Sequence, residues 1–435
     1  MTPKITQRIA QLQHSELPTG YKRGKLGIVP VEWDDVPFAS LFVSTSDYTD
    51  DLETYPLYSL TLEDGITAKT ERYDRSHLVK KSESYKIVRP NDFAYNPMNI
   101  RLGAVARHKG SCPVAVSGYY DIFTTISPDD LAFMDSFLTC APMITYYNKV
   151  STGSLLEKQR VHFSQFLEFS LPLPPLGERK KIGAILSAQD TVIELQERLL
   201  TEKRRQKKWL MQRLLTGKQR LPGFCGKWQA GQFGDVFHFI PNNTYSRERM
   251  TALVGEIRNV HYGDILVKYH SVIDCGSNDL PFLNDDVKIS QAMLLKSGDI
   301  IIADTAEDLT AGKAVEIINV ADNQVVSGLH TMACRPVQDL FTPKWLGYYM
   351  SSDAYHNQLI PLICGTKVSS ISRREIMNTT VAIPTIEEQA AIVEILSTAD
   401  REIDLLRASL EQEKRKKKAL SQLLLTGIVR CISNE

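Results

Sequence analysis

Residues 171–186 read LPLPPLGERKKIGAIL, and residues 381–396 read VAIPTIEEQAAIVEIL. Each stretch leads into a long segment that ends in the same four residues, LLTG. When 174–217 is aligned with 384–427 without a gap, 19 of the 44 positions are identical. Similarity that keeps its register over this length indicates an internal duplication, so the chain consists of two copies of one unit.

Both copies have the pattern of a long amphipathic helix, with apolar side chains three, four and seven residues apart. These side chains are Ile182, Ile185, Leu186, Ile193, Leu200, Leu210 and Leu214 in the first copy, and Ile392, Ile395, Leu396, Ile403, Leu410, Leu420 and Leu424 in the second. Prolines precede each helix, and Gly217 and Gly427 suit its C-cap.

A helix of about 39 residues is about 58 Å long at about 1.5 Å per residue. A single apolar face on so long a helix favours a helical partner, and the other copy is the obvious one. If a pseudo-two-fold axis relates the two units, the helices pair as an antiparallel coiled coil. We therefore expect the globular parts at opposite ends of the helical pair.

The segments between the helices have the pattern of a mixed fold. Residues 85–95, 114–126 and 294–304 are rich in β-branched and aromatic residues and are punctuated by Gly, Asn and Asp, which is typical of strands and turns. Residues 127–140 and 342–360 carry Ser or Thr before an apolar run, which is typical of a capped helix. The sequence thus predicts an α+β fold with two α/β domains.

We divide the chain into five parts on these patterns. They are an N-terminal helical segment at 1–20, α/β domains at 21–173 and 222–383, and helical spacers at 174–221 and 384–435. The N-terminal segment has Ile5, Ile9 and Leu12 at helical spacing and precedes Thr19-Gly20. It either stands in for the end of a preceding helix, which would make the duplication circular, or is a frayed helix without that role.

The composition, 43% hydrophobic and 23% charged, is that of a globular protein. No apolar run approaches the roughly 20 residues that span a bilayer, and the N-terminus lacks the apolar core of a signal peptide. Without such a run, we expect no membrane partner. The seven cysteines form no CxxC pair, so we expect a cytoplasmic protein. With 51 basic and 51 acidic residues, the net charge of zero neither demands nor excludes nucleic acid.

Motifs that carry catalysis or bind a cofactor are missing from the sequence. Asn96-Pro97-Met98 only approaches the Asn/Asp-Pro-Pro-aromatic motif of amino-methyltransferases, and Gly312-Lys313 lacks the P-loop glycine, since Glu307 stands there. Histidines and cysteines show no metal-ligand spacing. Paired carboxylates such as Asp129-Asp130 stand in turn-like contexts. We expect no catalytic residue, no cofactor and no metal.

The tandem proline-led helix starts, with the basic runs and LLTG endings that follow them, resemble the specificity subunits of type I restriction–modification systems over essentially the whole chain. The first copy departs mildly from the usual acidic-Glu-Gln pattern, with Gly177-Glu178-Arg179 in place of Glu387-Glu388-Gln389. The resemblance implies two target-recognition domains that read a bipartite site in double-stranded DNA, with an unread spacer set by helix length. It also implies two DNA adenine methyltransferase subunits as partners, and restriction/translocase subunits that join through them.

Side chains of the types that contact bases and phosphates form two clusters in the first domain, at 67–81 and 94–111. The candidate DNA-binding residues are Lys69, Arg72, Tyr73 and Arg75 in the first cluster, and Tyr95, Asn96, Asn99, Arg101, Arg107 and Lys109 in the second. A solvated surface of ordinary Lys and Arg is the alternative for each cluster.

The second domain offers loops at 242–250 and 365–375. Their candidate DNA-binding residues are Asn242, Asn243, Tyr245, Arg247, Thr366, Lys367, Ser369, Ser370 and Arg373. The second loop aligns with 151–160 of the first copy, which favours a shared role in contacting the DNA backbone. The basic runs 202–209 and 413–420 either track phosphates, dock a methyltransferase subunit, or are solvated helix faces.

Other functions fit part of this pattern. The alternatives are the specificity subunit of a bifunctional type II restriction–methylation enzyme, an interaction scaffold that binds no DNA, and a self-contained enzyme. Salt-dependent DNA binding distinguishes a recognition subunit from a pure scaffold. Methyl transfer by the purified chain alone would identify an enzyme, which the missing motifs disfavour.

Overall fold

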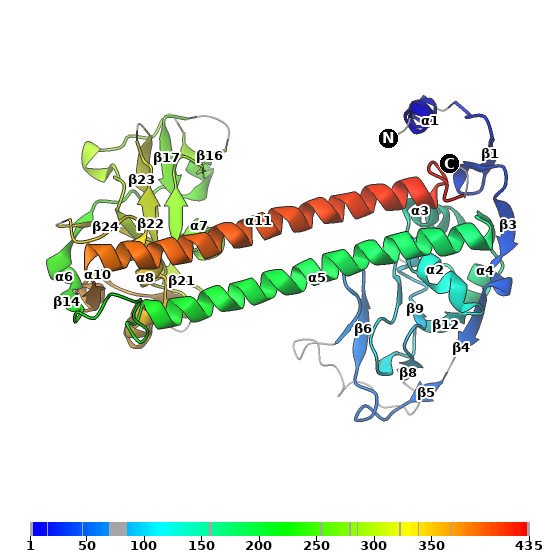
Figure 1. The fold of residues 1–435 in the computed structure, drawn as a ribbon, viewed down its shortest axis with the longest axis horizontal. Coiled ribbons are helices and arrows are strands. Elements are labelled where there is room, and N and C mark those ends of the chain that lie inside the picture. The colour runs from blue at the N-terminus through cyan, green and yellow to red at the C-terminus, as the bar shows by residue number, and fades with distance from the viewer. Residues whose placement is uncertain are drawn as a thin grey trace. The chain divides into compact units, whose positions relative to one another are not determined.

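The computed structural model describes residues 3–14, 16–45, 47–68, 85–155, 159–252, 255–277, 280–284, 286–321, 323–337, 339–365 and 367–432. The chain forms two compact units (Figure 1). Unit 1 comprises Met1–Glu197 with Ser409–Glu435, and unit 2 comprises Arg198–Ala408. Both boundaries fall within long helices, so each unit contains a globular part and a portion of each helix.

The two long helices that the sequence predicts are α5 (Leu176–Leu214) and α11 (Ile386–Leu425), of 39 and 40 residues. Each begins directly after the proline-containing stretch. Each is followed by a glycine in the left-handed region, Gly217 with φ 67° and Gly427 with φ 71°. Glycine adopts this conformation without steric cost, so it ends the helices where the sequence indicates.

Segments of α5 and α11 pack against each other within each unit. Polar contacts join Gln189 to Glu413 (2.6 Å) and Gln196 to Ser409 (3.3 Å) in unit 1, and Lys203 to Glu402 (2.6 Å) and Lys207 to Asp400 (2.5 Å) in unit 2. Residue numbers on one helix rise as those on the other fall, so the packed segments run antiparallel.

Most of the predicted apolar stripe faces inward. The fully or nearly buried members are Ile182, Leu186, Leu200, Leu214, Ile392, Leu396, Ile403, Leu410 and Leu424. Ile185 differs, with 40% of its side chain exposed, because the face that α5 buries is narrower than the stripe.

In the described residues, the globular part of unit 1 consists of short antiparallel strands and three helices. One sheet has the order β10-β9-β12-β4 (Val105–Arg107, Phe93–Tyr95, Asp121–Thr125, Phe42–Thr45), and another the order β11-β8-β5 (Val114–Ser117, Tyr85–Val88, Tyr48–Thr49). Two-stranded pairs are β1-β2 (Tyr21–Gly24, Gly27–Pro30), β3-β13 (Asp34–Pro37, Ser170–Leu173) and β6-β7 (Tyr58–Thr61, Gly65–Ala68). The helices are α2 (Leu131–Phe137), α3 (Ala141–Val150) and α4 (Phe163–Leu167).

Aromatic side chains form the core of unit 1. Phe93 on β9 stacks on Phe123 of β12 with ring centroids 5.1 Å apart, and Phe42 meets Phe123 edge to face at 5.0 Å. Ile182 and Leu186 of α5 belong to the same buried cluster. The start of α5 is therefore an integral part of this core.

The globular part of unit 2 is also α+β but has mixed strand directions. Its larger sheet has the order β15-β24-β20-β22-β18 (Phe237–Ile240, Thr331–Pro336, Ile300–Ala303, Ala314–Ile318, Val272–Asp274), and the smaller β16-β19-β17-β23 (Met250–Thr251, Phe282–Leu283, Ile257–Val260, Gln324–Ser327). Pairs are β14-β26 (Gln229–Gln232, Thr380–Ile383) and β21-β25 (Thr305–Ala306, Ser369–Ser370). The helices are α6 (Phe233–Val236), α7 (Tyr262–Val267), α8 (Trp345–Met350), α9 (Asp353–Leu359) and α10 (Arg373–Met377).

The N-terminal helix α1 (Pro3–Gln13) is present, and contacts within unit 1 bear on the two roles left open for it. Gly427, at the end of α11, lies against Trp33 as Gly217, at the end of α5, lies against Trp228. The Tyr21 hydroxyl also donates to the Gly427 carbonyl at 2.7 Å. The duplication is thus circular, but α11 rather than α1 supplies the preceding helix end.

The one departure from the repeat motif has a structural reason. In the first copy, Arg179 donates from Nε to Oδ1 of buried Asp130 at 2.7 Å and from Nη1 to the Pro174 carbonyl at 3.2 Å. In the second copy, Gln389 donates to the carbonyls of Pro384 and Leu340, both at 2.9 Å. Leu340 follows Asp130 by the same number of residues that separates Pro384 from Pro174. The charged Arg179 therefore has a carboxylate as its partner, and the neutral Gln389 has a backbone carbonyl at the corresponding position.

Candidate nucleic-acid interface

Part of the predicted interface in unit 1 is buried. Tyr95 on β9 is fully buried, its hydroxyl donates to the Val161 carbonyl at 2.8 Å, and burial raises its pKa. Asn96 is 9% exposed, and its Oδ1 accepts the Met98 N–H at 3.1 Å, which closes a turn. Both side chains are used inside the fold, so we correct the prediction that they contact DNA.

Asn99 and Arg101 flank the start of a 3-10 turn at Ile100–Leu102. Asn99 is exposed, and Arg101 is half-buried, with its Nη1 3.4 Å from Oε1 of Gln159. Their placement at the surface of unit 1 is compatible with the predicted role.

Arg107 and Lys109 share a carboxylate. Arg107 Nη2 lies 3.2 Å and Lys109 Nζ 3.0 Å from Oδ2 of Asp135, which is itself largely buried. Lys109 is also 3.9 Å from Asp190 of α5, and its side chain is 56% exposed. Lys109 therefore presents its charge beside the helix, whereas Arg107 is largely enclosed.

The other predicted cluster of the first domain, with Lys69, Arg72, Tyr73 and Arg75, lies outside the described residues. Thr366 of the second domain lies outside them as well.

The two predicted loops of the second domain meet in the structure. Arg373, at the start of α10, donates from Nη2 to Oδ1 of Asn242 at 3.1 Å, although 131 residues separate them. The guanidinium of Arg373 also lies over the Phe239 ring, 5.2 Å from its centroid. Asn242 Nδ2 donates to the Gly328 carbonyl at 3.2 Å. Arg373 is exposed, so this junction presents a cation and an amide together at the surface.

The side chain of Asn243, next to Asn242, lies in the interior instead of at the surface. It is 3% exposed, and its Nδ2 donates to Oδ1 of Asn259 at 2.8 Å and to the Ser327 carbonyl at 2.9 Å. Its Oδ1 accepts the Tyr245 N–H at 3.1 Å. With every polar atom of its side chain engaged in the interior, Asn243 holds the loop in shape, and we correct the prediction that it contacts DNA.

Tyr245 and Arg247 lie further along the same loop. The Tyr245 hydroxyl donates to the Lys288 carbonyl at 3.4 Å. Arg247, 54% exposed, forms a bidentate pair with Asp264 of α7, with contacts of 3.1 and 2.9 Å. An ion pair with one exposed partner is weak, so a phosphate can compete for Arg247.

Residues 367–370 are divided between surface and interior. Lys367 is exposed. Ser369 and Ser370 form β25, which pairs with β21; Ser369 is 8% exposed and Ser370 is exposed. Burial removes Ser369 from the predicted interface and leaves Lys367 and Ser370 on it.

The structure adds residues that sequence reasoning missed. His330, in a turn with φ 54°, has its Nδ1 3.4 Å from the Thr305 hydroxyl, and its ring meets Tyr262 edge to face at 5.3 Å. Burial and then the charge of Arg247 lower the pKa of the neighbouring His261. These side chains come from three separate segments, so no motif in the sequence links them.

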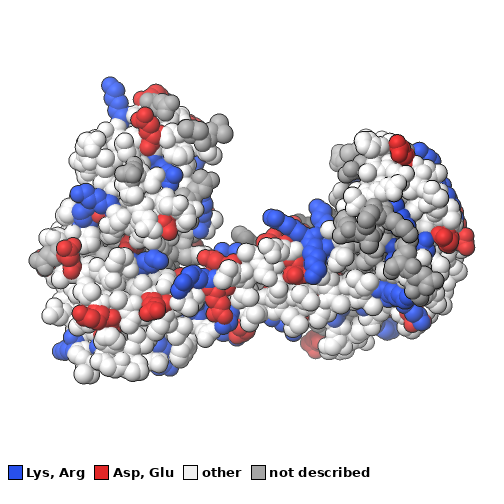
Figure 2. Space-filling view, turned by 45° about the horizontal axis from the view of Figure 1, so that its top comes forward, with Lys and Arg blue, Asp and Glu red and all other residues white. Residues whose placement is uncertain are grey.

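Charge on the surface is grouped rather than continuous. Figure 2 shows Lys and Arg in small groups over the globular parts and the helices, with Asp and Glu among them. Among the described residues, no group of three or more His, Cys, Asp or Glu side chains is arranged to hold a metal. Within the same residues, no helix is long and apolar enough to cross a membrane.

Comparison with known proteins gives this arrangement a context. Residues 226–414 match the family model of the type I restriction modification DNA specificity domain. The type I restriction enzyme MjaVIII specificity subunit of Methanocaldococcus jannaschii is 27% identical over 282 residues, which are 61% of this chain and 63% of that protein. The chain thus matches less than two thirds of this relative's length.

Two solved structures share the fold. One is the S subunit of a type I restriction–modification system from M. genitalium, with a TM-score of 0.52, 13% identity, and coverage of 98% of this chain and 99% of that one. The other comes from a study of complex assembly and conformational transition of the type I R-M system, with a TM-score of 0.52, 16% identity, and coverage of 92% and 99%. This chain is similar to type I restriction–modification specificity subunits.

The matched segment 226–414 contains every candidate residue of the second domain, including Asn242 and Arg373. Candidates of the first domain precede it. The junction of the two loops in unit 2 therefore lies inside the matched segment.

Proposed function

We propose that this chain is the DNA-recognition subunit of a type I restriction–modification complex. The observation that carries the proposal is the meeting of Asn242 and Arg373 within the segment that matches a DNA specificity domain. Arg side chains contact guanine edges and phosphates, and Asn side chains contact adenine edges, in protein–DNA complexes. An α+β framework that holds both on adjoining loops suits readout of a half-site.

The finer architecture is part of the proposal. Residues 21–173 and 222–383 act as target-recognition domains, and 174–221 and 384–435 as spacers. The helices pair as an antiparallel coiled coil, which the contacts of Gln189 with Glu413 and of Lys207 with Asp400 support. A bipartite target, whose unread spacer depends on helix length, remains a prediction of this arrangement.

The proposed partners are two DNA adenine methyltransferase subunits, joined in turn by restriction/translocase subunits, in the cytoplasm. Exposed apolar side chains on the helices are available for contact with such partners. Leu195 and Trp209 of α5 are 58% and 47% exposed, and Leu405 of α11 is 72% exposed. In this proposal the methyl donor binds to the partner, and the chain itself catalyses nothing.

The matches described above all name type I systems, so we prefer this function to that of a bifunctional type II subunit. The test is single-molecule methylome sequencing of the source cell with and without this gene. Loss of one bipartite methylated motif is the expected result and would give both half-sites and the spacer. An unchanged methylome, in cells that express the chain and a cognate methyltransferase, would instead favour a scaffold without DNA binding.

A further inference from the structure

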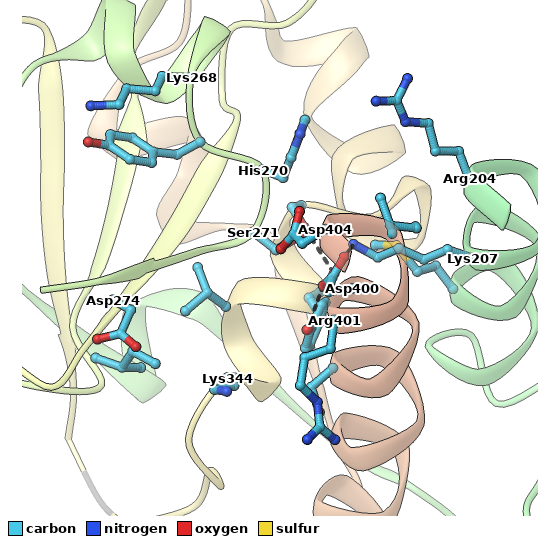
Figure 3. A pocket seen from close by; sticks show the side chains of 18 of the residues that line it. Arg204, Lys207, Lys268, His270, Ser271, Asp274, Lys344, Asp400, Arg401 and Asp404 are labelled. Atoms are coloured by element: carbon cyan, nitrogen blue, oxygen red, sulfur yellow. Dashed lines mark hydrogen bonds and ion pairs between the residues drawn. The ribbon is translucent and has the colours of Figure 1, made fainter. Parts of the chain in front are cut away.

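A groove in unit 2 gathers positive charge where the helices meet the globular part. It has a volume of about 630 Å³ and is lined by eight Lys and Arg side chains but only three Asp. Figure 3 shows that these side chains come from different elements, with Arg204 and Lys207 on α5, Arg401 on α11, and Lys268 and Lys344 on the globular part. The groove is thus built by the fold rather than by one basic run.

Some of the cations are already neutralised. Lys207 Nζ lies 2.5 Å from Oδ1 of Asp400, and Oδ2 of the same carboxylate accepts the Tyr348 hydroxyl at 2.7 Å. Arg204 and Lys208 are exposed, and among the described residues their side chains form no hydrogen bond or ion pair. The groove therefore holds an excess of positive charge with free donors.

The surroundings of His270 show the same excess of positive charge. This histidine lines the groove. Burial, and then the charges of Lys313, Lys207 and Arg407, lower its pKa. A protonated imidazole is disfavoured here partly because cations face it from several elements.

Unit 1 contains a second groove with the same basic wall. Lys414, Lys417 and Lys418 of α11 line it, together with Lys109 of the globular part. In the alignment of the two copies these three lysines correspond to Arg204, Lys207 and Lys208. Lys417 pairs with Asp190 as Lys207 pairs with Asp400. The helical walls thus repeat, whereas the globular walls differ.

A repeated wall beside two different globular parts implies a ligand that both units share. Protein interfaces deplete charge at their centres, whereas nucleic-acid interfaces are strongly positive. Eight cations against three carboxylates in unit 2 match the second case. The phosphodiester backbone is the same for every base sequence, which fits a wall that does not vary.

We infer that the two grooves bind the phosphodiester backbone of duplex DNA beside each half-site, independently of its bases. The inference rests on the proposed function. In this arrangement the loops around Asn242 and Arg373 read sequence in unit 2, while Arg204 and Lys208 supply affinity. Base contacts and backbone contacts then reside on separate elements of the unit.

The test measures DNA binding by the full chain with its methyltransferase subunits, at several salt concentrations. Arg204→Gln/Lys208→Gln removes two groove cations. Arg205→Gln/Arg415→Gln is the matched control, because Arg205 and Arg415 are aligned positions, are exposed, and line neither groove. The probes are a duplex carrying the methylated motif and a duplex of scrambled sequence. Thermal unfolding checks that both variants fold.

We expect the groove variant to bind both duplexes more weakly and to flatten the slope of log affinity against log salt by about 1.8, at about 0.9 per lost phosphate contact. The control should keep the wild-type slope. An unchanged slope with weaker methyltransferase binding would overturn the inference and show a protein-docking groove. Equal flattening in the control would also overturn it. If the wild-type complex binds neither duplex, the proposed function itself fails.

Discussion

Arg220 and Glu388 form a bidentate ion pair at the start of α11, with 2.6 Å from Nε to Oε1 and 2.7 Å from Nη2 to Oε2. Trp228 Nε1 donates to the same carboxylate at 2.9 Å, and Glu388 is 1% exposed. The pair ties the segment that follows α5 to the first turn of α11 within unit 2.

Unit 1 repeats this arrangement with residues from both ends of the chain. Arg430 donates to Glu178 from Nε at 2.9 Å and from Nη2 at 3.0 Å, and Trp33 Nε1 lies 3.3 Å from the same carboxylate. Arg430 and Glu178 are 252 residues apart. The glutamate of the repeat motif, at 178 and 388, therefore anchors the turn after the partner helix in each unit.

Breaking this anchor should destabilise unit 2. Arg220→Ala leaves the buried Glu388 carboxylate without its cation, so the free energy of unfolding should fall and the unfolding midpoint should move to a lower urea concentration. Urea unfolding followed by circular dichroism measures the loss. Arg374→Ala, at an exposed position, is the control and should leave the midpoint unchanged. Equal midpoints for Arg220→Ala and wild type would contradict the structural role.

Two adjacent asparagines should respond differently to truncation. Asn242→Ala removes a half-buried partner of Arg373, so we expect weaker binding of the cognate duplex by about 1–3 kcal/mol, with a smaller change in stability than for Asn243→Ala. Asn243→Ala removes a buried residue that Asn259 and Ser327 require as a partner. It should lower the free energy of unfolding by about 1–3 kcal/mol.

Fluorescence anisotropy with labelled duplex and urea unfolding measure the two effects on the same preparations. Arg373→Ala should behave like Asn242→Ala. The assignment of roles would be wrong if Asn242→Ala lost stability while Asn243→Ala lost only DNA binding.

The departure of the first copy from the repeat motif can be tested as a double-mutant cycle. Arg179→Gln alone leaves buried Asp130 unpaired and should cost about 3–5 kcal/mol. Adding Asp130→Leu reproduces the Gln389 and Leu340 combination of the second copy and should restore most of the loss. The free energies of unfolding of the wild type, the two single variants and the double variant give the coupling energy between Arg179 and Asp130. Simple additivity of the two single losses would refute this pairing.

The stability of unit 2 should depend on the protonation of Glu316. This carboxyl is 1% exposed and accepts the N–H groups of Lys344 at 2.6 Å and Gly347 at 2.9 Å. Burial raises its pKa from 4.5 to about 7. Between pH 4.5 and pH 7, the Glu316 carboxyl therefore keeps its proton in the folded state, whereas it has lost the proton in the unfolded chain. The contribution of Glu316 to the free energy of unfolding therefore falls as pH rises from 4.5 to 7, by about 3 kcal/mol in total.

Glu316→Gln removes this titration, since an amide does not ionise. The free energy of unfolding of wild type minus that of the variant should fall across pH 4.5 to 7, whatever the constant offset from the substitution. Glu307→Gln, at an exposed position, is the control for the loss of one carboxylate. A flat difference for Glu316→Gln would show that the carboxyl titrates normally.

The sequence by itself determined the duplication, the two long helices and their ends. Helix formation depends on the spacing of residues that are close in the sequence. The signals for it are therefore local: the shared register of 174–217 and 384–427, the stripe of apolar residues, and the glycines Gly217 and Gly427. Several strands were also predictable, such as β8 and β20, because β-branched runs bounded by turn residues indicate them. The neutral net charge was equally visible, but it identifies no ligand.

Only the tertiary structure decided which candidate side chains reach the surface. Tyr95 and Asn99 lie four residues apart in one predicted cluster, yet the first is in the core and the second is exposed. Asn242 and Arg373 meet across 131 residues, and the wall of Arg204 and Lys208 becomes a groove only beside the globular part. Burial and convergence depend on how distant segments pack, and packing between distant segments leaves no local spacing in the sequence.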